Sequence, residues 1–244
     1  MGIKAVSFDF WHTLFTESGD AFSFYGERRR KLLTDALAGY GSVTAVQIHE
    51  ASRAEAELHD MVWRQQHRTL PVAERIGTIL NHLEVRVPED VTMQIARAYE
   101  EGLLERPPTL VPGARDAVER LSTRYRLGII SDVGFSPGRV LKQVLAATGL
   151  IEAFDSLVFS DEAGFSKPHL EVFRRTARNL DCEPSEMVHI GDLEHTDIVG
   201  AKRAGCRAIR FTGITPMAEQ EKTMADGATA SMNALPALVE TLEG

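Results

Sequence analysis

Short runs of β-prone apolar residues alternate with amphipathic stretches along much of the chain. The apolar runs predict buried strands over residues 3–8, 127–130, 156–159, 187–190 and 207–211. The amphipathic stretches predict helices over residues 114–121, 140–145 and 170–180, one ending at Ala204 before a capping Gly205, and one over 235–242. Because strands and helices alternate, we predict an α/β fold, a Rossmann-like three-layer core whose mostly parallel sheet carries helices on both faces.

Between the first and second predicted strands the pattern changes to consecutive helices. These are predicted over residues 21–38, 44–68, 76–83 and 89–104. In the third, the spacing i, i+3, i+4, i+7 of one apolar face is occupied by Ile76, Ile79, Leu80 and Leu83. A pair of prolines, Pro107 and Pro108, then interrupts the helical pattern. We therefore expect an all-helical cap over residues 16–106, inserted into a core domain made of residues 1–15 and 107–244.

Polar side chains stand at the ends of several predicted strands. They are Asp9, Ser131, Ser160 or Asp161, and Asp192. Parallel sheets bind ligands at the carboxyl ends of their strands, so we expect the functional site at this edge.

The composition limits the class of partner. The 244 residues are 43% hydrophobic and 25% charged, which excludes wholesale disorder. Lys and Arg number 27 against 35 Asp and Glu, a formal net charge of −8, so we expect neither nucleic acid nor an anionic membrane as a partner. A small anionic metabolite stays compatible, because a local site can be positive on an acidic protein.

The cysteines and the first residues bear on location. Cys182 and Cys206 form no C-x-x-C pair, which fits a reducing compartment. The opening segment MGIKAVSFDFWHTLF lacks the long apolar stretch of a signal peptide or a membrane span. We expect a cytoplasmic protein, and the sequence leaves a homodimer open.

Four short segments follow one another in a fixed order. They are FDFWHTL at 8–14, IISD at 129–132, SKPHLEVF at 166–173 and GDLEHTD at 191–197. The last has the spacing G-D-x-x-x-x-D and leads into IVGAKRAG. Together these segments resemble the motifs of the haloacid dehalogenase superfamily, and the helical insert resembles the all-helical cap of that family.

The resemblance implies a role for each acidic motif residue. Asp9 would be the nucleophile that attacks phosphorus and forms an aspartyl-phosphate. Because a carboxylate and a phosphate repel each other, Mg²⁺ is expected, held by the side chains of Asp9 and Asp192 and the main-chain carbonyl of Trp11. Asp197 matches a position farther from the metal in that family. It would bind the metal directly or through a water molecule, or it would orient the metal's ligands.

The same resemblance implies further contacts with the substrate. Ser131 would donate its hydroxyl to the phosphoryl oxygens, and Lys167 would neutralise charge on the transferring group and on Asp9. We also expect Trp11, His12 and Asp132 to lie beside the substrate.

Trp11 departs from the family's phosphatase pattern, which has a second Asp two residues after the nucleophile. That Asp protonates the leaving group, whereas an indole only donates a hydrogen bond and does not titrate. Three explanations compete: a substrate whose leaving group needs no acid, a proton supplied by His12 or by a cap residue, or chemistry other than phosphoryl transfer.

The third explanation has a specific form, because the dehalogenase branch of the family carries an aromatic residue at this position. That branch, however, lacks the metal motif that Gly191 and Asp192 provide here. We therefore expect a Mg²⁺-dependent phosphatase of a small phosphorylated metabolite. The alternatives are a carbon–halogen hydrolase working through an aspartyl ester on Asp9, and a catalytically weak protein that keeps the metal site.

Some side chains suit both a structural and a functional role. The run Arg28-Arg29-Arg30-Lys31 covers all sides of a helix, so most of its members are expected to face solvent, although they could attract an anionic substrate. Four aromatic residues could line a substrate pocket, although most of them are expected to pack inside the cap, namely Phe22, Phe24, Tyr25 and Trp63. His189, within a strand, is expected to be a hydrogen-bonded core histidine.

Overall fold

The computed structural model describes all residues except 1, 18, 217–221 and 244. Its main sheet has six strands in the order β5-β4-β1-β6-β7-β8, and every neighbouring pair is parallel. The strands are β1 (Ala5–Phe8), β4 (Arg126–Ser131), β5 (Ser156–Phe159), β6 (Met187–Gly191), β7 (Arg207–Phe211) and β8 (Gly227–Thr229). The five predicted strands are confirmed. The edge strand β8 was not predicted, because its sequence Gly-Ala-Thr contains no apolar run.

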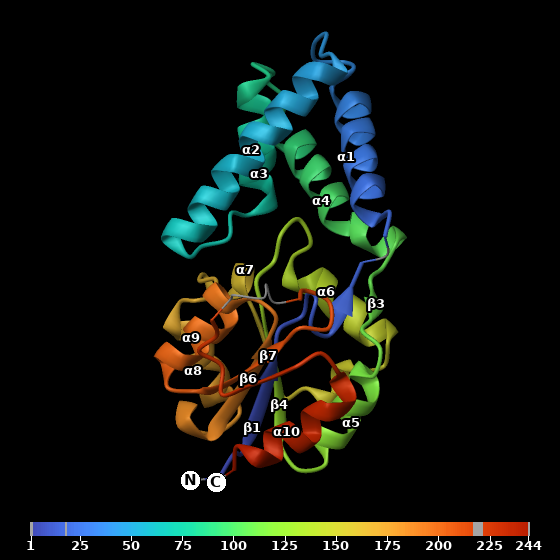
Figure 1. Cartoon of the computed structure of the whole chain (residues 1–244). Coiled ribbons are helices and arrows are strands. Elements are labelled where there is room, and N and C mark those ends of the chain that lie inside the picture. Colours follow the sequence, from blue (N-terminus) through green and yellow to red (C-terminus); the bar gives the residue numbers. More distant parts are fainter. Residues whose placement is uncertain (1, 18, 217–221, 244) are drawn as a thin grey trace.

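Helices cover both faces of this sheet, which confirms the three-layer α/β core (Figure 1). One face packs against α5 (Ala114–Ser122), α6 (Gly138–Ala147) and α10 (Leu235–Thr241). The other face packs against α8 (Leu170–Asn179) and α9 (Val199–Ala204). Successive side chains of a strand point to opposite faces of the sheet. In β1, Val6 and Phe8 pack in the apolar cluster on the first face and Ala5 packs in the cluster on the second. Gly205 ends α9 with a φ of 91°, the left-handed conformation predicted for this cap.

Four consecutive helices form a separate layer above the carboxyl edge of the sheet (Figure 1). They are α1 (Ala21–Leu37), α2 (Ala45–Gln66), α3 (Val72–His82) and α4 (Glu89–Glu105). They share an apolar cluster of their own, in which Ile76, Ile79 and Leu80 form the buried face of α3 as predicted. Within the part of the chain that the structure covers, no helix combines the length and apolarity needed to cross a membrane.

Two very short strands join the helical layer to the sheet. β2 (Phe15–Thr16) pairs antiparallel with β3 (Thr109–Leu110), so the outgoing and returning connections run side by side. The sequence pattern did not predict this pair, since two residues are too few for a periodic signal. We propose the division of the chain at this point, with residues 16–106 as the cap.

Candidate active site

Three buried carboxylates meet at the carboxyl edge of the sheet. Asp9 follows β1 and Asp192 follows the adjacent strand β6, while Asp197 lies in the π-helical turn η3 (Glu194–Ile198). Oxygen atoms of the three side chains lie within 4.8 Å of one another. Gly191 permits this approach, because a Cβ atom at that position would lie 2.3 Å from Cγ of Asp197. The last motif therefore needs its glycine as well as its two acids.

Lys167 is buried between two of these acids. Its Nζ atom lies 2.5 Å from Oδ1 of Asp9 and 2.6 Å from Oδ1 of Asp197. Burial alone would lower the pKa of Lys167, but the charges of Asp197 and Asp9 outweigh burial and raise this pKa above its ordinary value. The lysine is therefore a fixed positive charge beside the candidate nucleophile.

Asp197 is the most fully hydrogen-bonded of the three acids. Besides Lys167, it accepts hydrogen bonds from His189 Nε2 at 3.1 Å, the Leu193 backbone N–H at 3.1 Å and Thr196 Oγ1 at 3.3 Å. Burial would raise the pKa of Asp197, but Lys167 and His189 hold it well below its usual range. Asp197 is thus held as a carboxylate whose orientation is set by its neighbours.

His189 extends the hydrogen bonds of Asp197 to a residue inside the sheet. It is fully buried in β6, and its Nδ1 atom lies 2.9 Å from the hydroxyl of Ser7 in β1. Both ring nitrogens are therefore engaged, which confirms the predicted hydrogen-bonded core histidine. No pattern in the sequence predicted that its partner would be Asp197.

Among the residues that the structure describes, the carboxylates of Asp9 and Asp192 accept fewer hydrogen bonds than that of Asp197, so their negative charges are less fully balanced. Burial raises the pKa of Asp9 well above its usual range, because the charge of Lys167 offsets burial only in part and the charges of Asp197 and Asp192 add to the rise. Burial, followed by the charge of Asp197, also raises the pKa of Asp192, whose Oδ2 accepts a 2.7 Å hydrogen bond from Thr215. Lys167 is one positive charge among three carboxylates, and a hard divalent cation, which prefers oxygen ligands, would balance the rest. The donor set therefore fits such a cation.

The residues after β4 tie the site to the cap. Ser131 is buried, and its hydroxyl donates to the Asp132 carbonyl at 3.1 Å. The Asp132 carboxylate accepts hydrogen bonds from the Lys167 backbone N–H and from Trp63 Nε1 of α2, both at 2.9 Å. Trp63, one of the four aromatic residues of which most were expected to pack inside the cap, does not follow that expectation: its ring contacts Asp132 and His195, which belong to the core. A tryptophan that bridges two domains has the same sequence signal as one that packs within a helix bundle.

Trp11 and His12 follow Asp9, the candidate nucleophile, and line the cavity beneath the cap. The Trp11 ring packs edge-on against Phe10 at 5.0 Å. His12 has a positive φ of 55°, and its Nε2 atom lies 3.2 Å from Glu17 while its Nδ1 atom lies 3.8 Å from Asp192. The position of the family's second Asp thus holds an indole, with a histidine beside it.

A cavity of about 400 Å³ lies between the cap and the core. Its core wall includes Trp11, His12, Asp132, Gly134, Phe135 and Ser136, and its cap wall includes Tyr25, Arg28, Arg29, His59, Arg75 and Tyr99. Of the basic run, Arg28 and Arg29 turn toward this cavity, whereas Arg30 and Lys31 are exposed. The expectation that most of the run faces solvent holds for only two of its four members, because helix geometry sends neighbouring side chains to different faces.

The expected packing of the other aromatic residues also needs correction. Tyr25 is buried with the apolar cluster of the core rather than with that of the cap, and Phe24 packs against the same cluster. Phe22 is 72% exposed, and both Phe22 and Tyr25 line the cavity, the other role expected for these residues. The first turns of α1 are therefore part of the contact between the two layers.

Comparison with known proteins identifies the family. A model of the haloacid dehalogenase-like hydrolases matches residues 3–205. The chain therefore belongs to this family of hydrolases, as its motifs indicated.

Similar curated proteins include phosphatases. A glyceraldehyde 3-phosphate phosphatase from Methanothermobacter thermautotrophicus is 35% identical over 112 residues, 45% of this chain and 47% of that protein. A pyrimidine 5′-nucleotidase from Escherichia coli is 35% identical over 99 residues, 40% of this chain and 42% of that protein. The chain thus spans about half the length of these relatives or less.

Similar solved structures cover nearly the whole chain. A 2-haloacid dehalogenase from Pseudomonas syringae has a TM-score of 0.73 at 22% identity and covers 98% of this chain and 99% of its own. A phosphatase of the same family from Thermococcus onnurineus has a TM-score of 0.67 at 22% identity. The match covers 97% of this chain and 98% of that protein's chain. At this identity the likeness shows the shared fold.

Proposed function

We propose that this hydrolase is a Mg²⁺-dependent phosphatase that acts on a small phosphorylated metabolite through an aspartyl-phosphate on Asp9. The observation that carries the proposal is the meeting of Asp9, Asp192 and Asp197 with Lys167 at the edge of the sheet, below the cavity. Phosphatase names among the relatives support it. Cys182 and Cys206, both free thiols, support a reducing cytoplasm as its location.

Two of the three acids would bind the metal directly, and the third would orient their surroundings. Asp9 and Asp192, together with the main-chain carbonyl of Trp11, would provide the oxygen ligands, and bound Mg²⁺ would neutralise charge on the phosphate and the nucleophile. Asp197 already accepts hydrogen bonds from four groups, so we assign it to orienting Lys167 and the loop of Asp192.

The reaction divides into two displacements at phosphorus. An oxygen of Asp9 attacks phosphorus, the bond to the leaving-group oxygen breaks, and the alcohol departs with a proton from solvent or a neighbouring acid. Water then attacks the aspartyl-phosphate, releasing inorganic phosphate and restoring the carboxylate. Lys167 holds positive charge beside the attacking oxygen, and the Ser131 hydroxyl would turn from the Asp132 carbonyl to donate to a phosphoryl oxygen.

Trp11 supports a specific limit on this activity. General acid catalysis is worth about 10²–10⁴-fold, and an indole cannot provide it. Esters with poor leaving groups should therefore be hydrolysed slowly unless His12 or a cap residue supplies the proton.

Trp11 also supports the second candidate, a carbon–halogen hydrolase that uses the same nucleophile. Against it stands Asp192, a second buried carboxylate beside Asp9 that would be costly without a cation between the two. The third candidate, a protein that binds the metal and turns over weakly, follows from the missing acid.

One screen separates the three candidates. Phosphorylated metabolites and 2-haloacids are incubated with the protein in Mg²⁺ and in EDTA, and release of phosphate or halide is measured, with Asp9→Asn as control. We expect phosphate release in Mg²⁺ only. Halide release that persists in EDTA would support the dehalogenase, and accumulation of labelled aspartyl-phosphate without release would support the weak enzyme.

A further inference from the structure

Three arginines stand on the cap wall of the cavity, and two of them are already paired. Arg28 donates to Glu105 at 2.5 Å and to the Ala98 carbonyl at 2.8 Å. Arg75 is buried and donates to both carboxylate oxygens of Glu55, at 2.5 and 3.2 Å. Their charges are thus satisfied within the cap.

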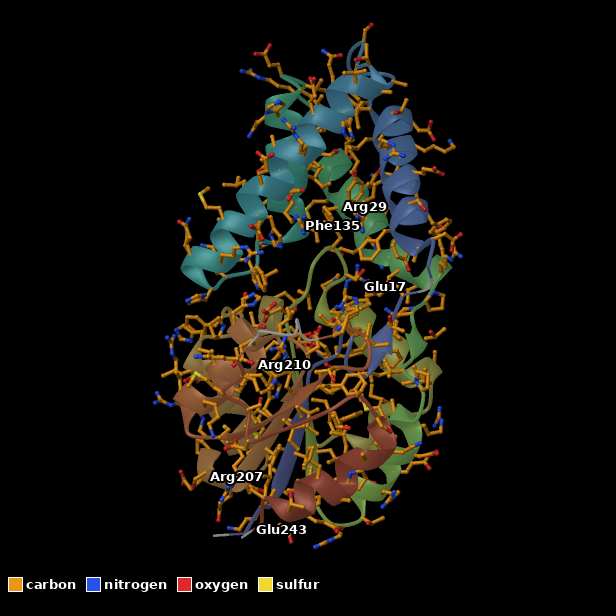
Figure 2. The ribbon with its side chains drawn as sticks, viewed as in Figure 1. Glu17, Arg29, Phe135, Arg207, Arg210 and Glu243 are labelled. Carbon is orange, nitrogen blue, oxygen red and sulfur yellow. The ribbon has the colours of Figure 1, made fainter. Side chains whose placement is uncertain are left out.

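Arg29 differs from both. Within the part of the chain that the structure covers, its guanidinium forms no ion pair or hydrogen bond with a carboxylate. It lies over aromatic rings, 4.2 Å from the centre of Phe135 and 5.9 Å from those of Tyr25 and Tyr99. Arg75 also lies over the Phe135 ring, at 3.5 Å, but its charge is paired with Glu55. Figure 2 shows Arg29 beside Phe135, among the cap helices. A guanidinium stacked on rings keeps its in-plane N–H groups available for an anion.

The surroundings keep this arginine charged and in place. Burial lowers the pKa of Arg29 to about 10, so the side chain is still a cation at neutral pH. The cavity's acidic groups are engaged elsewhere, since Glu17 is hydrogen-bonded to His12 and Asp132 to Trp63 and Lys167. A partly buried cation without an ionic partner is costly, and a ligand anion would remove that cost.

The two ends of the cavity therefore differ in chemistry. Trp11, His12 and Asp132 line the cavity and stand within three residues of Asp9 or Ser131 in the chain, whereas Arg29 lines it from the cap helix α1. We propose that Arg29 is a binding subsite for a second anionic group, so that the substrate is a phosphate ester whose leaving group carries a carboxylate or another phosphate. The inference rests on the proposed phosphatase function, with Asp9 receiving the phosphoryl group.

Matched ligands test the subsite by binding alone. In an Asp9→Asn background with Mg²⁺ present, calorimetry compares 3-phosphoglycerate with glycerol 3-phosphate, which differ only in a terminal carboxylate or alcohol. Fructose 1,6-bisphosphate against fructose 6-phosphate tests a second phosphate in the same way. We expect the extra anion in at least one pair to tighten binding by about 10- to 100-fold, the range of a charge-assisted bidentate pair.

Variants on one helix assign that preference to Arg29. Adding Arg29→Met should remove the preference, and Arg29→Lys should keep part of it because it retains the charge without the fork. Arg30→Met loses the same charge at the neighbouring exposed position and should keep the full preference. Equal affinity within both pairs, or a preference that survives Arg29→Met, would overturn the inference.

The proposed function has a separate readout. Hydrolysis of p-nitrophenyl phosphate by the protein with Asp9 intact tests the phosphatase activity with a leaving group that carries no second anion. If this hydrolysis occurs and the binding preference is absent, the subsite fails and the phosphatase stands. If the preference depends on Arg29 and no phosphate ester is hydrolysed, the anion subsite stands and the phosphatase fails.

Discussion

The Nζ atom of Lys167 lies 2.6 Å from Oδ1 of Asp197, and both side chains are almost completely shielded from solvent. Lys167 also reaches Asp9, so one lysine holds two acids that come from different motifs. This ion pair fixes the charge beside Asp9, the proposed nucleophile, and its loss should affect both stability and activity.

Replacing Asp197 by Asn should lower the free energy of unfolding by about 2 kcal/mol, because it breaks a buried ion pair while Lys167 keeps only Asp9. Turnover should fall by about 10- to 100-fold through loss of the lysine's orientation. Urea denaturation and phosphate release measure the two effects. Asp60→Asn breaks the exposed pair with Arg64 and should cost less than about 0.5 kcal/mol. Equal losses in the two variants would contradict this account.

Replacing Trp11 by Asp should raise the turnover of alkyl phosphates at least tenfold, because it restores a general acid at that position. The gain should be smaller for p-nitrophenyl phosphate, whose leaving group needs no proton. Trp11→Asn removes the same indole without adding an acid and serves as the matched control. An unchanged rate in the Asp variant, with the protein folded, would show that another residue already supplies the proton.

Mg²⁺ should raise the thermal unfolding midpoint of the protein, because a cation that binds only the folded site stabilises it by mass action. Asp192→Asn should abolish this rise, and its midpoint without Mg²⁺ should equal or exceed that of the unaltered protein, since a buried carboxylate is removed from beside Asp197. EDTA should return the unaltered protein to its metal-free midpoint. Asp181→Asn, at an exposed position away from the cluster, should leave the response to Mg²⁺ intact. A rise that persists in Asp192→Asn would place the cation elsewhere.

Alkaline pH should weaken the fold through Cys206. Burial raises the pKa of this thiol to about 12 in the folded protein, whereas an unfolded cysteine titrates near 8.5. Between these values the unfolded state has lost the proton that the folded state keeps, so stability falls as pH rises, by about 1.4 kcal/mol per pH unit. Urea denaturation at pH 8 and pH 10 should therefore show a shallower loss in Cys206→Ala. Cys182→Ala should reduce the slope by a similar amount between pH 8 and pH 10, because burial raises the pKa of that thiol to about 11 and it also keeps its proton in the folded protein over this range. The same slope in all three proteins would contradict the assignment.

Local pattern was enough to predict most of the elements. Apolar runs such as Met187–Ile190 and the face formed by Ile76, Ile79 and Leu80 reflect backbone geometry that acts over a few residues. The same geometry places Asp9 and Asp192 at the ends of their strands. Strand β8 and the β2–β3 pair escaped prediction, because such short strands form only where a neighbouring strand is already in place.

The sequence by itself determined the α/β core, the helical insert between its first two strands, and the motif residues Asp9, Ser131, Lys167 and Asp192 at one edge. Only the tertiary structure decided which side chains meet across the chain. It joined Trp63 to Asp132, and it set Phe135 against Arg29 while leaving Arg30 in solvent. Neighbouring arginines carry the same local signal, and their surroundings differ because the packing of cap against core, over long separations in sequence, determines which helix face is buried.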